Sequence, residues 1–164
     1  MSASGIPVIA RRLVDPLVAQ LRQGITPERI ALTLALAGVI GVLPIIGTTT
    51  VLCAWVAVRL RLNQPLIQLA NYLLYPLQLL LLLPFCRAGE TLFGQPHLPV
   101  FSAHALVARI NAGPLRFVAD YGMSLLYGTV VWALVAPFAG VLLYVVLRPL
   151  LRALARRVRI SRAG

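Results

Sequence analysis

One stretch inside the first apolar run limits what this chain can form. Residues 30–58 carry no charged side chain, and Gly41 to Thr50 within them reads GVLPIIGTTT. Two glycines and a proline in such a run predict a break in the helix. In a bilayer, a broken helix is tolerated only where its backbone is buried in protein or lines a wet cavity. We therefore look for function first at this break, with Gly41, Pro44 and Gly47 as its structural residues.

The amino-acid composition indicates whether the chain folds in water or in a membrane. Of its 164 residues, 60% are hydrophobic and 12% are charged, and the mean hydropathy is +0.89. A water-soluble domain of this size could not bury so much apolar surface. We predict an integral membrane protein of the all-α class. The net charge of +11 comes from arginines beside apolar runs, so we expect anionic membrane lipids as partners and no nucleic acid.

The order of apolar runs, prolines and arginines divides the chain into four parts. Residues 1–24 are predicted to form an interfacial helix. Residues 25–94 form a core, with a broken re-entrant hairpin at 30–60 and a transmembrane helix at 66–86 that bends near Pro76. Residues 95–121 form a loop and a second interfacial helix. Residues 122–164 form a transmembrane helix with a basic tail, which either lies on anionic lipid or serves only as an orientation signal.

The hairpin has an alternative, a single kinked span of nearly 30 residues. The apolar helix from Ile30 to Val42 is only about 20 Å long, against about 30 Å of hydrocarbon. If the hairpin is re-entrant, twelve arginines lie on one side and three, Arg87, Arg109 and Arg116, lie on the other. If it crosses, the split is seven against eight. The positive-inside rule therefore favours the re-entrant hairpin with both termini cytoplasmic.

Hydroxyl, amide and guanidinium groups in and after the break are the candidate ligand contacts. The threonines provide hydroxyls and the arginines provide positive charge at the mouth of the hairpin. The amides inside the second apolar run are first of all interhelical hydrogen-bond partners and only second ligand contacts. The substrate-binding hypothesis comprises Thr48, Thr49, Thr50, Arg59, Arg61, Asn63, Asn71 and Gln78.

Catalytic and metal-binding patterns are missing from the sequence. There is no phosphate-binding glycine loop, no nucleophile elbow and no metal-ligand spacing. We predict no enzyme activity, no cofactor and no metal, with His97 and His104 as isolated interfacial residues. Glu28 is interpreted as a helix-start carboxylate beside Arg29, and Glu90 is placed in a loop that runs from Ala88 to Pro99.

The core resembles a known family. A proline-led, alanine-rich helix, a G-x-x-P-x-x-G-x-x-T turn and an arginine-x-asparagine segment are similar to the domain of unknown function 2062 (DUF2062), a bacterial membrane family. The matching positions are Pro27, Ala31, Gly41, Pro44, Gly47, Thr50, Arg61, Leu62 and Asn63. Where that family usually has Asn-Pro and then a threonine, this chain has Tyr75-Pro76-Leu77-Gln78. The resemblance, from Thr26 to Gly94, implies a bacterial inner membrane location and this architecture.

Two functions from different classes fit these patterns. In the first, the protein binds or moves an anionic lipid or a polyprenyl phosphate through the re-entrant hairpin, since fixed arginines suit phosphate. In the second, it is a membrane scaffold subunit whose small-residue face packs a protein partner or a second copy of the chain. That face consists of Thr33, Ala37 and Gly41.

Overall fold

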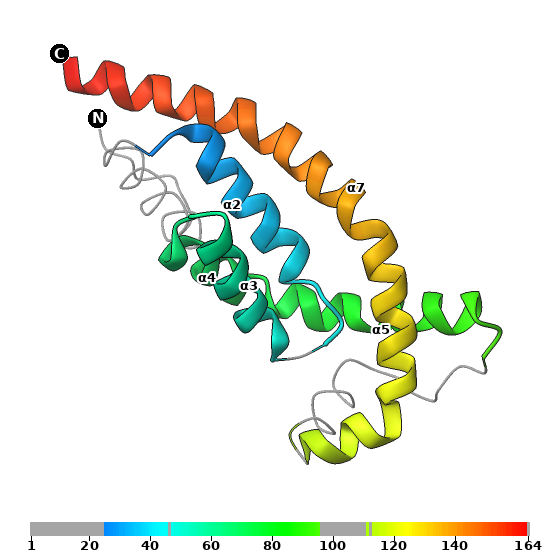
Figure 1. Ribbon diagram of the computed structural model, residues 1–164. Coiled ribbons are helices and arrows are strands. Elements are labelled where there is room, and N and C mark those ends of the chain that lie inside the picture. Colours follow the sequence, from blue (N-terminus) through cyan, green and yellow to red (C-terminus); the bar gives the residue numbers. More distant parts are fainter. Residues whose placement is uncertain (1–24, 46, 96–110, 112, 164) are drawn as a thin grey trace.

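The regular structure is helical throughout the part of the chain that the computed structural model describes. That part comprises residues 25–45, 47–95, 111 and 113–163. Its helices are α2 (Pro27–Ile40), α3 (Thr48–Arg59), α4 (Gln64–Leu73), α5 (Tyr75–Leu92) and α7 (Pro114–Ala163) (Figure 1). The all-helical prediction is therefore confirmed. The predicted interfacial helix at 1–24, and His97 and His104, lie outside the described residues.

The predicted break separates α2 from α3. Helix α2 ends at Ile40 and α3 begins at Thr48. Gly47 precedes α3 with φ of +89°, a left-handed conformation that glycine adopts without steric cost. A Cβ on Gly41 would lie 2.7 Å from the Ala37 carbonyl oxygen and 3.3 Å from Leu74 Cβ. Gly41 is therefore required by close packing and Gly47 by its backbone conformation, and α3 returns along α2 as a hairpin (Figure 1).

A tight turn joins α3 to α4. The Leu62 N–H donates to the Ala57 carbonyl (2.8 Å) and the Arg61 N–H donates to the Val58 carbonyl (3.3 Å). This is the Schellman pattern of a helix C-terminus, in which the left-handed residue is usually glycine. Here it is Arg61, with φ of +51°. Asn63 then caps α4, because its side-chain oxygen accepts from the Leu66 N–H at 2.9 Å.

Helices α4 and α5 are bent by 60° relative to each other. The sequence predicted one helix at 66–86 with a bend near Pro76. The structure ends α4 at Leu73 and places Pro76 in the first turn of α5, where a missing N–H costs nothing. Helix α5 continues to Leu92, so the prediction of a loop from Ala88 onward is wrong for Ala88 to Leu92.

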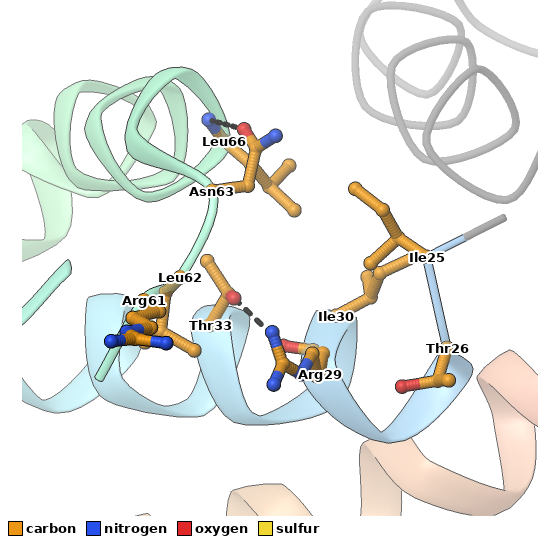
Figure 2. Close-up of a pocket in the computed structure, with 9 residues that line it drawn as sticks. All are labelled: Ile25, Thr26, Arg29, Ile30, Thr33, Arg61, Leu62, Asn63 and Leu66. Atoms are coloured by element: carbon orange, nitrogen blue, oxygen red, sulfur yellow. Dashed lines mark hydrogen bonds between the residues drawn. The ribbon is translucent and has the colours of Figure 1, made fainter. Parts of the chain in front are cut away.

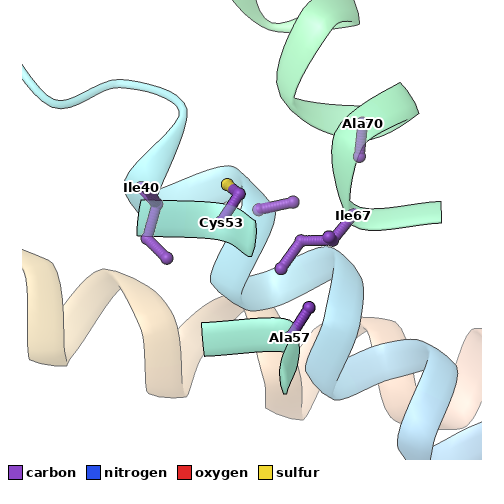
Figure 3. Close-up of a cluster of buried hydrophobic side chains, with 6 residues drawn as sticks. Ile40, Cys53, Ala57, Ile67 and Ala70 are labelled. Atoms are coloured by element: carbon purple, nitrogen blue, oxygen red, sulfur yellow. The ribbon is translucent and has the colours of Figure 1, made fainter. Parts of the chain in front are cut away.

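The interior of the hairpin is built from small side chains. One buried cluster joins α2, α3 and α4 and consists of Ala37, Ile40, Cys53, Ala57, Ile67 and Ala70 (Figure 3). Alanines and a cysteine at these positions let helix backbones approach closely. A second cluster, formed by Ile30, Ala31, Leu66 and Leu151, packs α7 against the start of the hairpin. Thr33 and Ala37, from the predicted small-residue face, are 1% and 0% exposed within this one chain.

Helix α7 runs antiparallel to α2 and crosses α5 (Figure 1). A Cβ on Gly89 of α5 would lie 2.4 Å from the Tyr127 backbone carbon, so the two helices touch through glycine. Residues 122–156 of α7 form a helix that is long and apolar enough to cross a membrane. By length and composition, the bent pair of α4 and α5 is a second candidate if it counts as one span. The predicted tail helix is a continuation of α7.

Candidate anion-binding site at the arginine end of the hairpin

A cleft of about 460 Å³ lies where the hairpin begins and ends. One wall is the first turn of α2 and the other is the turn between α3 and α4 (Figure 2). These walls meet because α3 returns along α2, which brings residues 29 and 61 together. The lining consists of Ile25, Thr26, Arg29, Ile30, Thr33, Arg61, Leu62, Asn63 and Leu66.

Two guanidinium groups give the cleft its charge. Arg29 and Arg61 both line it and both are exposed. In the part of the chain that the structure describes, neither arginine forms an ion pair. Glu28 lies in the first turn of α2, as predicted, but the neighbouring Arg29 is not its ion-pair partner. Glu28 Oε1 instead accepts a 2.6 Å hydrogen bond from Nε of Arg152 on α7.

The Glu28–Arg152 pair fixes the protonation of this carboxylate. The hydrogen bond from Arg152 is the main reason why the pKa of Glu28 lies below its usual value, and the charges of Arg152 and Arg148 act in the same direction. Since Glu28 is already paired, its negative charge is compensated on the α7 side. Among the described residues, no carboxylate therefore compensates the positive charge of Arg29 or Arg61.

Polar groups around the two arginines complete one side of the cleft. Thr26 precedes α2 but its side chain makes no capping hydrogen bond. The Thr33 hydroxyl donates to the Arg29 carbonyl at 2.7 Å, and the Asn63 side chain caps α4. Helices α2 and α4 both begin at this cleft, and the N-terminal end of a helix carries partial positive charge. Of these features, the two helix N-termini and the uncapped Thr26 hydroxyl favour an anion, whereas Thr33 and Asn63 are used within the chain.

Apolar side chains form the rest of the lining. Ile25, Ile30, Leu62 and Leu66 face the same cleft, and Ile30 and Leu66 also belong to the buried cluster beneath it. Ligand sites commonly combine an apolar wall with a few polar groups that fix orientation. This cleft therefore suits an amphiphile with a small anionic head.

The predicted threonines lie at the other end of α3 from this cleft. Helix α3 has 12 residues, which is about 18 Å. The exposed Thr48 hydroxyl donates to the Ile45 carbonyl, and Thr49 is buried. The Thr50 carbonyl accepts from Gln68 Nε2 (3.0 Å), and its hydroxyl accepts from Asn71 Nδ2 (3.5 Å). Thr50 and Asn71 are therefore engaged in holding α3 against α4, whereas Thr48 bonds within the break.

The other predicted contacts also have structural partners. Gln78 Nε2 donates a 2.8 Å hydrogen bond to the Leu43 carbonyl in the break. The indole of Trp132 on α7 donates to the Val39 carbonyl at 2.9 Å. The guanidinium of Arg59 lies over the Trp55 ring, 5.5 Å from its centroid, and Arg59 is not among the cleft residues. Of the predicted ligand residues, the structure brings Arg61 and Asn63 together in the cleft.

Two features were missed at the sequence level. Glu90 is 3% exposed in α5 and accepts a hydrogen bond from the Ser124 hydroxyl of α7. A groove of about 330 Å³ on α7 is lined by Tyr144, Val145, Arg148, Pro149, Arg152 and Arg156. The four-residue spacing of Arg148, Arg152 and Arg156 could have indicated this groove, because it places the three side chains on one face of a helix. The burial of Glu90 has no signal in the local sequence, because its partner Ser124 is 34 residues away.

One sequence family covers most of the chain. The sequence model of a family described as an uncharacterized protein conserved in bacteria, DUF2062, matches residues 10–159. The chain belongs to the DUF2062 family. The DUF2062 match begins before α2 and ends within α7, so the relationship extends well beyond the segment from Thr26 to Gly94. No curated protein and no solved structure matches the chain.

Within the described part of this DUF2062 chain, no group of three or more histidine, cysteine or acidic residues lies close enough together to hold a metal ion.

Proposed function

We propose that this DUF2062 protein is a multi-pass protein of the bacterial inner membrane with both termini in the cytoplasm. Helix α7 crosses once and the bent pair of α4 and α5 crosses back. From Gly128, at the crossing with α5, to Arg148 is about 30 Å of helix, which equals the thickness of the hydrocarbon core. Helix α2, with 14 residues, is only about 21 Å long, so the α2–α3 hairpin enters and leaves on one side.

The position of the arginines supports this orientation. Arg29 and Arg61 line the cleft, and Arg152 of the α7 groove binds Glu28 at the start of α2. One end of the molecule therefore contains the start of α2, the turn between α3 and α4 and the basic part of α7. An arginine-rich end is typical of the cytoplasmic side of a membrane protein.

The contacts of the break support an apolar setting. The freed carbonyls of Val39 and Leu43 receive hydrogen bonds from Trp132 and Gln78. In a membrane each unsatisfied backbone group is costly, so side-chain donors from other helices are what a buried re-entrant tip requires. The outer faces of α3 and α7 are apolar, with Val51 70% and Phe138 78% exposed, as lipid contact would require.

The function that we propose is binding of an anionic lipid headgroup in the cleft. The observation that carries it is the pair Arg29 and Arg61, two cations without a carboxylate partner in the described chain, beside an apolar wall. Guanidinium groups bind phosphate through two parallel hydrogen bonds. A lipid bound there has its phosphate at the cytoplasmic end and its chains along the apolar lining.

Lipid retention tests this function. The protein is purified in a neutral detergent with added phosphatidylglycerol and phosphatidylcholine, and bound lipid is counted by native mass spectrometry. We expect retained phosphatidylglycerol, reduced about a hundredfold in the Arg29→Gln, Arg61→Gln double variant, because two charge-assisted contacts of about 1.5 kcal/mol each are lost. The matched control is Arg59→Gln, which removes an arginine outside the cleft. Equal retention by all three proteins contradicts the proposal.

If the protein is a scaffold subunit instead, its partner must bind a surface other than the small-residue face of Thr33, Ala37 and Gly41. Thr33 and Ala37 are buried against the chain itself. The exposed apolar face of α3, formed by Val51, Leu52, Trp55 and Val58, is the surface on which a partner helix would pack. Crosslinking from a Val58→Cys variant in membranes to a defined neighbour would favour this alternative.

A further inference from the structure

We infer that the cleft selects a phosphomonoester headgroup, a dianion, over the monoanionic phosphodiester of ordinary phospholipids. The inference rests on the proposed function and specifies its ligand class. It starts from charge. Two guanidinium groups line the cleft, and Glu28, the carboxylate beside them in the described residues, is bound by Arg152. The net charge that an occupant has to balance is therefore two.

The type of cation adds to this argument. Arginine stays charged at every pH that the protein meets, so the two charges are permanent. A phosphodiester carries one negative charge, so it would neutralise one of the two guanidinium charges and leave the other without a counter-charge. A phosphomonoester carries a charge of about −1.5 to −2 at neutral pH and would balance both.

Hydrogen-bond geometry points in the same direction. A phosphomonoester has three terminal oxygens and a diester has two. Each guanidinium offers a fork of donors, one from the wall of α2 and one from the turn after α3 (Figure 2). Two guanidinium forks on separate walls suit a head with three terminal oxygens better than one with two.

The apolar wall identifies the ligand as an amphiphile. Ile25, Ile30, Leu62 and Leu66 occupy nearly half of the lining positions. Ile30 and Leu66 are already buried, so an acyl or prenyl chain would bury apolar surface chiefly on the half-buried Ile25 and Leu62, from which free phosphate would gain nothing. The ligand class is thus a lipid whose phosphate is a terminal monoester.

This class has its own pH dependence. The second ionisation of a phosphomonoester has a pKa of about 6, and a diester does not titrate in this range. The charged groups that face the cleft or adjoin it in the described chain are Arg29, Arg61 and the Glu28–Arg152 pair, and the pKa of Glu28 is lowered. Guanidinium groups keep their charge in proteins and the pKa of Glu28 is lowered, so we attribute a change in affinity near pH 6 to the ligand.

The test compares three soluble probes by calorimetric titration of the protein in neutral detergent at about pH 8 and about pH 5. The probes are dihexanoyl phosphatidic acid, dihexanoyl phosphatidylglycerol and inorganic phosphate. At the higher pH we expect phosphatidic acid to bind about tenfold more tightly than phosphatidylglycerol, since one further arginine contact is satisfied. At the lower pH the ratio falls toward one. Inorganic phosphate binds more weakly than phosphatidic acid.

Variants assign the effect to the cleft. Arg29→Gln and Arg61→Asn, the latter compatible with the left-handed backbone at that position, each abolish the preference for phosphatidic acid. Arg59→Gln keeps it.

Each contrary result has one meaning. Equal affinity for the two lipids at about pH 8 overturns the monoester inference and leaves headgroup binding intact. Equal affinity for phosphate and phosphatidic acid overturns the assignment to an amphiphile. If no probe binds, the proposed function itself fails.

Discussion

The side-chain amide of Gln78 donates a 2.8 Å hydrogen bond to the backbone carbonyl of Leu43, and both residues are buried. The two are 35 residues apart, on α5 and in the break after α2. A helix that stops in an apolar region leaves carbonyls without donors, and this amide supplies one. The contact holds the tip of the hairpin against α5.

Replacing Gln78 with leucine should therefore destabilise the protein. Leucine keeps the volume but leaves the Leu43 carbonyl without a donor, at a cost of about 1–3 kcal/mol. Equilibrium unfolding in detergent measures the loss. The control is Thr48→Val, which removes an exposed hydrogen bond to the Ile45 carbonyl in the same break. That bond lies on the surface of the chain and joins residues of the same turn, so its loss should cost less. A control that costs as much as Gln78→Leu would count against a contact that anchors the tip.

The crossing of α5 and α7 should tolerate alanine in a graded order. An added Cβ would meet backbone at 2.4 Å at Gly89 and at 3.1 Å at Gly128, but only the Val39 side chain at 3.4 Å at Gly140. Gly89→Ala should cost about 1–3 kcal/mol through overpacking, and Gly128→Ala less. Gly140→Ala should be neutral or stabilising, because alanine favours the helix. Thermal unfolding of the three variants checks the order, and equal losses would show that the helices do not cross at these glycines.

Substitutions at Arg61 should distinguish its contribution to lipid binding from its effect on the free energy of unfolding. The left-handed backbone conformation of Arg61 costs an L-residue about 1–2 kcal/mol, and glycine avoids this cost. Glycine, however, loses more conformational entropy on folding, which offsets the gain. Arg61→Gly should thus leave the free energy of unfolding within about 1 kcal/mol while lipid binding is lost. Arg61→Val, with a branched side chain at positive φ, should lose both. If Arg61→Gly retained full lipid binding, Arg61 would have no place in the site.

The Glu28–Arg152 pair makes stability depend on pH. Because the pKa of Glu28 is lower in the folded protein than its usual value of 4.5, the pair stabilises the fold above that value. This contribution is lost as the pH falls through the folded pKa. Unfolding midpoints measured from neutral pH down to pH below 4.5 should fall for the native protein and fall less for Glu28→Gln. Identical pH profiles would mean that the pair contributes nothing.

Much of the fold followed from local chemistry. A proline and two glycines in an uncharged run predict the break, and an asparagine before Gln-Pro predicts the start of α4. The bend after Leu73 is present because Pro76 has no N–H to continue the helix. Each of these features depends on residues within one or two turns, which is the range over which a single sequence is informative.

The site depended on contacts that no local pattern contains. Arg29 and Arg61 share a cleft because α3 returns along α2, and the sequence had grouped Arg61 with Thr48 to Thr50 instead. Glu28 could not be assigned to Arg152, which is 124 residues away. Glu90 looked like a loop residue because glycine, proline and charge cluster around it, yet packing of Gly89 on Tyr127 keeps it helical and buried.

Sidedness is the central claim, and cysteine accessibility tests it most directly. In a variant with Cys53 and Cys86 replaced by alanine, single cysteines are introduced at three exposed positions, Thr26, Thr48 and Gln95. An impermeant maleimide is then applied to intact cells and to inverted membrane vesicles. We predict that Thr26→Cys is labelled only from the cytoplasmic side, that Gln95→Cys is labelled only from the opposite side, and that Thr48→Cys is labelled from neither. Labelling of Thr48→Cys from the outside, or of Gln95→Cys from the cytoplasmic side, would contradict the re-entrant hairpin and the cytoplasmic arginine cleft built on it.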